Sequence, residues 1–131
     1  MAKATIQDIL DEGFRPEQFG LIDSSAWSDQ GGYLDRALVD AALWARARLG
    51  AAAYDGLAPN TYATSCIKMA EVQYVRAMLF KRRVAFFDSS ANLSLQFPAY
   101  SERRGYADDA NRSMLCAQEA IAEAMRELGM D

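Results

Sequence analysis

The stretch from Pro59 to Phe87 constrains the fold of this chain more than any other part of its sequence. It contains no glycine or proline after its first residue, and its interior is rich in residues that favour a helix. Asn60 or Thr61 can cap this helix, because their side-chain oxygens accept hydrogen bonds from free backbone N–H groups. About 26 helical residues would extend about 39 Å, which is long for so small a chain. We therefore expect a central helix against which the other helices pack.

Three other segments have apolar residues at the spacing of an amphipathic helix. Each begins at a residue that can cap a helix and is followed by glycine. With 131 residues, of which 51% are apolar, the chain is expected to form one domain, residues 1–131, with a buried core. The expected class is all-α, a small helical bundle around one long central helix. The three segments run from Thr5 to Gly13, from Ser28 or Asp29 to Leu49, and from Asp108 or Asp109 to Leu128.

The composition argues against an enzyme. The chain has no histidine, which removes the commonest general base and the commonest metal ligand. Its two cysteines alone form neither a zinc site nor a cysteine–histidine nucleophile. No phosphate-binding glycine loop, dinucleotide fingerprint or nucleophile elbow is present. We therefore expect no catalytic residues, no cofactor and no metal.

The chain is expected to be soluble and cytoplasmic. No apolar run approaches the roughly 20 residues that span a membrane, and the first residues lack a signal-peptide pattern. A membrane partner is not expected either.

The helix that ends at Leu49 is apolar on two faces. Val39 and Leu43 lie nearly opposite its main apolar stripe. A helix of this kind is either buried on both sides or uses one side for a partner. Because the chain has so few helices, we expect Val39 and Leu43 to contact a partner. The main stripe consists of Leu34, Leu38, Ala41, Ala45 and Leu49.

Glu71 falls inside the apolar stripe of the central helix, near Ile67 and Tyr74. An isolated carboxylate is costly to bury, so Glu71 is expected to find a cation or a hydrogen-bond donor. Arg48, at the edge of the preceding helix's main stripe, is the first expected partner. We interpret Glu71 and Arg48 as a structural ion pair and not as a catalytic pair.

A long loop is expected before the last helix, from Asp88 to Gly105, because serines and a proline interrupt the helical pattern. Within it, Leu93, Leu95 and Phe97 alternate with polar residues, which is typical of a short extended segment. Such a segment either folds back on its own subunit or is covered by a partner. We expect the stretch through Tyr106 to contact an adjacent subunit or another protein.

The net charge of −4 is unevenly distributed. Residues 1–40 hold eight acidic residues against three basic ones, and residues 105–131 hold six against two. Residues 81–104 hold five basic residues against two acidic ones. The charges either neutralise one another within the folded chain or make copies complementary head to tail, which favours rings or filaments. The five basic residues are Lys81, Arg82, Arg83, Arg103 and Arg104.

The order of these segments resembles the tailed-phage head-to-tail connector proteins, the small helical adaptor or head-completion family. A short first helix precedes a Tyr-Leu-Asp-Arg-Ala-Leu-Val-Asp-Ala-Ala helix ending in Leu-Gly, then come a long central helix, an irregular loop and a Tyr-Ala-Asp-Asp-Ala helix. The segments that carry the resemblance are Tyr33–Gly50, Tyr62–Phe87 and Gly105–Leu128.

The resemblance implies a structural protein of the virion, located at the head–tail interface and in the host cytoplasm before assembly. Its copies would form a ring, commonly of twelve, that docks beneath the portal protein and contacts other connector or tail proteins. DNA would pass through the channel of the ring without sequence-specific binding.

A second class remains open, a small DNA-associated regulator. Its phosphate contacts would come from Lys81, Arg82 and Arg83 together with Arg103 and Arg104. The acidic remainder of the chain argues against it, as does the lack of a turn between helices that suits groove reading. A third class, a small carboxylate enzyme or a cofactor-free binding domain, has no positive feature in its favour.

Overall fold

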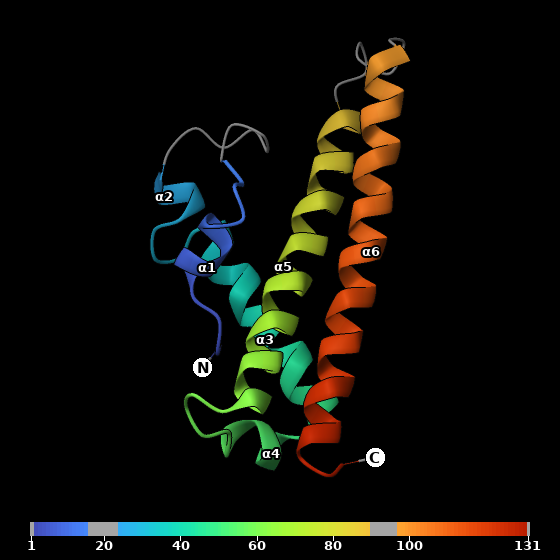
Figure 1. Ribbon diagram of the computed structural model, residues 1–131. Helices are drawn as coiled ribbons and strands as arrows, with labels where there is room; N and C mark the ends of the chain where they lie inside the picture. The colour runs from blue at the N-terminus through green and yellow to red at the C-terminus, as the bar shows by residue number, and fades with distance from the viewer. Residues whose placement is uncertain (1, 16–23, 90–96, 131) are drawn as a thin grey trace.

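The computed structural model describes residues 2–15, 24–89 and 97–130, with the side chains of 24–25, 86–89 and 97–102 left aside. All regular structure in these residues is helical, which confirms the all-α class. The helices are α1 (Ile6–Leu10), α2 (Ser24–Trp27), α3 (Tyr33–Leu49), α4 (Ala51–Asp55), α5 (Tyr62–Ser89) and α6 (Phe97–Glu127). Figure 1 shows α5 and α6 as a long hairpin, with the shorter helices beside one part of its length.

Helix α5 is the central helix that the sequence predicts. It contacts α6 along an extensive interface, and it also contacts α3 and α1. Thr61 caps its first turn, since the Thr61 side-chain oxygen accepts a hydrogen bond from the Thr64 backbone N–H at 3.2 Å. With 28 residues, the helix is about 42 Å long.

Alanines line the contact between α5 and α6 at intervals of seven residues. Seven residues make two helical turns, so the alanines of each helix lie on one side of it. All six are at most 3% exposed. Their small side chains allow the two helices to pack closely along the hairpin. They are Ala63, Ala70 and Ala77 on α5, and Ala110, Ala117 and Ala124 on α6.

Helix α3 packs on α5 with its predicted main stripe, which is buried along its whole length. One part of this core joins Leu34 and Leu38 to Val75 and Leu79 of α5 and to Ile9 of α1. Gly50 ends the helix as expected, because its φ of +100° is a conformation that residues with a side chain rarely adopt. The helix starts at Tyr33 and not at Ser28 or Asp29, and its N-cap residue makes no side-chain hydrogen bond.

The connection between α5 and α6 is shorter than the loop predicted from Asp88 to Gly105, because both helices extend into that range. Helix α6 begins at Phe97, well before Asp108. Pro98 is compatible with this start, since the first N–H groups of a helix have no partner within it. Gly105 lowers the helical propensity by about 1 kcal/mol, and packing against α5 offsets that cost.

Candidate functional site

A groove of about 500 Å³ separates the N-terminal segment from helix α3. The N-terminal segment forms one wall, and the outer side of α3 forms the other. Most of the lining side chains are apolar, with one acidic and one basic residue among them. The lining residues are Ala2, Ala4, Thr5, Ile6, Asp35, Leu38, Val39, Ala42, Leu43, Arg46 and Tyr54.

Val39 and Leu43 lie in this groove, and the prediction of a second apolar face on α3 is confirmed. Their exposed fractions are 54% and 60%. Leu38, on the main stripe of the same helix, is 5% exposed. The side chains that face the α5 core are therefore buried, while Val39 and Leu43 leave more than half of their surface exposed. That this exposed face contacts a partner stays a prediction.

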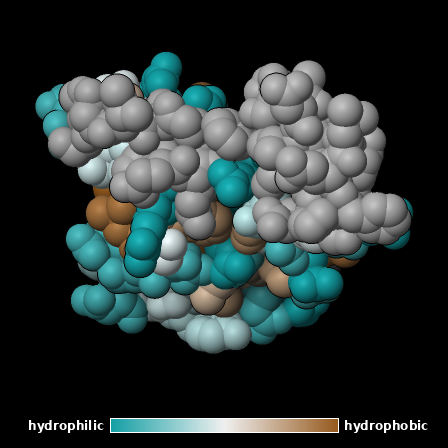
Figure 2. All heavy atoms as spheres, turned by 90° about the horizontal axis from the view of Figure 1, so that it is seen from above, coloured by the Kyte–Doolittle hydropathy of each residue, from teal (hydrophilic) through white to brown (hydrophobic). Residues whose placement is uncertain are grey.

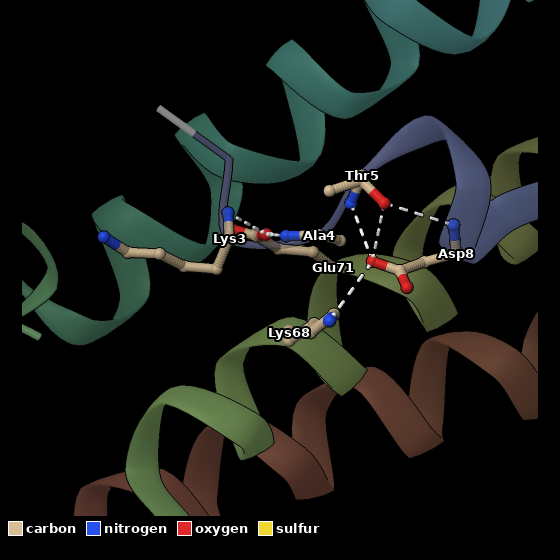
Figure 3. Close-up of polar contacts among 6 residues, drawn as sticks. All are labelled: Lys3, Ala4, Thr5, Asp8, Lys68 and Glu71. Carbon is tan, nitrogen blue, oxygen red and sulfur yellow. Dashed lines mark hydrogen bonds and ion pairs between the residues drawn. The ribbon is translucent and has the colours of Figure 1, made fainter. Parts of the chain in front are cut away.

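The N-terminal wall of the groove is held by Glu71 of α5. The backbone N–H groups of Lys3 and Ala4 donate to Oε1 of Glu71 at 2.7 and 2.8 Å. On the other side, the hydroxyl of Tyr54 donates a short hydrogen bond to Oε2. In Figure 3 the Glu71 side chain points from its helix towards the Lys3 and Ala4 amides. One buried carboxylate thus joins the N-terminal segment, α4 and α5.

The predicted ion pair between Glu71 and Arg48 is wrong. Glu71 is fully buried, as expected, but its partners are backbone amides and a tyrosine hydroxyl. Arg48 is exposed, and its guanidinium lies 5.5 Å from the centre of the Trp44 ring. The prediction placed both partners on helix faces. Two of the three observed hydrogen bonds come instead from the non-helical segment before α1, which a helical wheel cannot place.

Burial raises the pKa of Glu71 above its ordinary value, and the hydrogen bonds from Tyr54 and the two amides oppose that rise without cancelling it. Burial, together with the hydrogen bond to Glu71, also raises the pKa of Tyr54. Glu71 is 0% exposed, so its carboxyl group does not reach a substrate in solution. The geometry suits a structural anchor and not a general acid or base, which must contact the reacting group.

A second set of contacts fixes the N-terminal segment to α5. Thr5 and Asp8 form a reciprocal capping box at the start of α1. The Thr5 backbone N–H, with help from Lys68, holds the pKa of Asp8 below its ordinary value although burial opposes this. Nζ of Lys68, on α5, lies 3.5 Å from Asp8 (Figure 3). The wall of the groove is therefore attached at two points.

Two residues of the predicted basic cluster, Arg82 and Arg83, lie over aromatic rings of the same chain. The guanidinium of Arg82 lies 4.8 Å from the centre of the Tyr33 ring, and that of Arg83 lies 5.4 Å from the Tyr106 ring. Lys81 is exposed. Cations placed over aromatic faces are attracted to them, so these two arginines stabilise the fold.

The other predicted interface residues are distributed as follows. Arg103 is half-buried and Arg104 is exposed on α6. The Tyr106 ring stacks on Phe80, with ring centres 6.1 Å apart, so it takes part in the packing of α6 on α5. Phe97 is the first residue of α6, which rules out an extended conformation there. Leu93 and Leu95 lie outside the described residues.

The N-terminal wall of the groove was not predicted from the sequence. Its key donors are the backbone N–H groups of Lys3 and Ala4, which every residue except proline possesses. The one available signal was the buried position of Glu71, which required a donor without saying which one.

In the part of the chain that the structure describes, no group of three or more histidine, cysteine or acidic residues is placed to hold a metal ion. No helix there is long and apolar enough to cross a membrane. Comparison with known proteins finds no matching family model, no matching curated protein and no matching solved structure.

Proposed function

We propose that this chain is a structural subunit of a tailed-phage head-to-tail connector. Its copies assemble into a ring that docks beneath the portal protein and joins the head to other connector or tail proteins. DNA passes through the channel of the ring without sequence-specific binding. The protein works at the head–tail interface of the virion and is in the host cytoplasm before assembly.

The observation that carries this proposal is the exposed apolar face of α3. Val39 and Leu43 expose more than half of their surface beside a groove with mostly apolar walls. An apolar surface rimmed by polar residues marks an interaction site in soluble proteins. On the face seen in Figure 2, most of the coloured surface is hydrophilic. Hydrophobic atoms are exposed there only in small, separate areas.

The order of the helices supports the type of assembly. A short helix α1, the α3 helix, the long α5 and the final α6 follow one another as in the connector proteins that the sequence resembles. The buried carboxylate is used for anchoring, which suits a structural subunit. The DNA-regulator alternative is less well supported, because Arg82 and Arg83 lie over aromatic rings of their own subunit.

Replacing Leu43 by aspartate tests the proposal. We expect the wild-type protein to form a particle of several copies and Leu43→Asp to remain a monomer, because a charge in an apolar contact is costly to desolvate. The mass in solution, from light scattering or sedimentation, is the measurement. A matched control is Leu115→Asp on α6, since Leu115 is 59% exposed and Leu43 is 60% exposed.

Circular dichroism serves to show that both variants keep their helices. If Leu115→Asp and Leu43→Asp lowered the mass equally, α3 would not be a specific assembly surface. A wild-type protein that stayed monomeric at high concentration would contradict the connector assignment.

A further inference from the structure

We propose that Glu71 positions the surface through which copies of this chain assemble. By accepting hydrogen bonds from the backbone N–H groups of Lys3 and Ala4, Glu71 keeps one wall of the α3 groove in the place where a second copy docks. The inference rests on the proposed function and deepens it, because it names a residue outside the groove that determines the shape of the groove.

Glu71 acts on the groove through other residues. It is fully buried and is not one of the lining residues. Its two carboxylate oxygens nevertheless bind two residues that do line the groove. Oε1 accepts a hydrogen bond from the Ala4 backbone N–H at 2.8 Å, and Oε2 accepts one from the Tyr54 hydroxyl. The carboxylate therefore fixes a lining residue of the N-terminal segment relative to a lining residue of α4.

The N-terminal wall has little structure of its own. Residues 2–5 are not helical, and the helix α1 that follows them has only five residues. A helix that short is not stable alone in water. The shape of the wall therefore depends on its contacts with the rest of the subunit. The wall consists of Ala2, Ala4, Thr5 and Ile6.

Two polar contacts with α5 hold this wall, and they lie about one turn apart. Lys68 and Glu71 are three residues apart on α5, so their side chains lie on the same side of the helix. Nζ of Lys68 lies 3.5 Å from Asp8 of α1, while Glu71 holds the residues before α1 (Figure 3). Ile9 of α1 is 0% exposed in the core. Loss of the Glu71 hydrogen bonds should therefore release residues 2–4 and leave α1 in place.

The wall matters because it turns a helix face into a groove. Val39 and Leu43 alone offer one apolar face, whereas a segment inserted into the groove of about 500 Å³ is contacted on two sides. Association gains free energy with the apolar area that it removes from water. Release of the wall would also open the position of Ala4, now 4% exposed, and give water access to Glu71. A hydrated carboxylate beside an apolar contact is costly to desolvate.

Replacing Lys3 by proline tests this role without changing Glu71. Proline has no backbone N–H, so one of the two amide donors is lost. Lys3→Ala is the matched comparison. It loses the same side chain, whose Nζ lies 4.9 Å from the centre of the Tyr54 ring, but it keeps the N–H. We expect association to be at least tenfold weaker in Lys3→Pro than in Lys3→Ala, as measured by sedimentation at several protein concentrations.

Hydrogen exchange shows whether the change is local. In the Leu43→Asp background, which is expected to be monomeric, NMR can follow single amides. Lys3→Pro should accelerate exchange of the Ala4 amide, which is hydrogen-bonded to Glu71. The amide of Val75, in the buried part of α5, should keep its protection. This pattern would show that the wall is released while the fold is intact.

A conservative change at Glu71 gives a second measurement. Glu71→Gln keeps a carbonyl oxygen that can accept the two amide hydrogen bonds, so it should retain most of the association that Glu71→Ala loses. Because Glu71→Ala also lowers the stability of the whole domain, the comparison of the two Lys3 variants separates positioning from folding.

Equal association of Lys3→Pro and Lys3→Ala would overturn the positioning role of Glu71. A protected Ala4 amide in Lys3→Pro would overturn it as well, because the wall would then not depend on this contact. These failures differ from a failure of the proposed function. If the wild type assembles and Leu43→Asp does not, the connector assignment stands and only the role of Glu71 is wrong. If the wild type itself does not assemble, the connector assignment is contradicted.

Discussion

Replacing Glu71 by alanine is expected to lower the free energy of unfolding by about 3–5 kcal/mol. The change leaves the N–H groups of Lys3 and Ala4 and the hydroxyl of Tyr54 without their acceptor. Each buried donor left unsatisfied costs about 1–3 kcal/mol. Because natural domains have total stabilities of about 5–15 kcal/mol, this loss should be plain in urea unfolding. Unchanged stability would contradict the anchoring role of Glu71.

Glu71→Gln is the control, because its side-chain carbonyl can still accept the two amide hydrogen bonds while its amide group carries no charge. We expect it to destabilise much less than Glu71→Ala. It also tests the raised pKa of Glu71. A group whose pKa is higher in the folded state than in the unfolded state makes its full contribution to stability at pH values below its unfolded-state pKa. This contribution is lost as the pH rises through its folded-state pKa.

The stability of the wild type should therefore decline relative to that of Glu71→Gln as the pH rises from the unfolded-state pKa of Glu71 through its raised folded-state pKa. Unfolding both proteins in urea at a series of pH values measures the difference. A constant difference would mean that folding does not change the pKa of Glu71.

Replacing Ala117 by leucine is expected to destabilise the protein by about 1–3 kcal/mol, and to cost more if the α5–α6 hairpin cannot separate locally. Ala117 is 0% exposed, in the middle of the buried alanines of α6. Three extra carbon atoms there must push the helices apart or adopt a strained rotamer. Ala122→Leu on the exposed face of α6 is the control, and its effect should stay within about 0.5 kcal/mol.

Thermal unfolding of the two leucine variants gives the comparison. Equal stabilities would show that α5 and α6 are not closely packed at Ala117.

The fold was predictable where local sequence rules and packing agree. The run after Pro59 has no breaker, so α5 could be identified from the sequence. Gly50, with φ of +100°, ends α3 at the predicted residue. The start of α6 was wrongly predicted, because serines, Pro98 and Gly105 resemble a loop. Packing against α5 outweighs those preferences, and a single sequence carries no direct measure of that packing.

The candidate site was predictable in part for a similar reason. The angular positions of Val39 and Leu43 on a helix follow from the sequence, and so does their separation from the buried stripe. The partners of Glu71 did not follow, because two of its three hydrogen bonds come from a non-helical segment far away in the sequence. The groove exists only where that segment and α3 lie side by side.

Electron microscopy of the purified wild-type protein tests the central claim most directly. The claim, as proposed above, is that copies of this chain assemble through the exposed apolar face of α3 and close into a ring. The account predicts closed rings with a central channel for the wild type, and their loss in Leu43→Asp but not in Leu115→Asp. Single subunits or two-fold dimers in the wild-type sample, with no rings at any concentration, would contradict it.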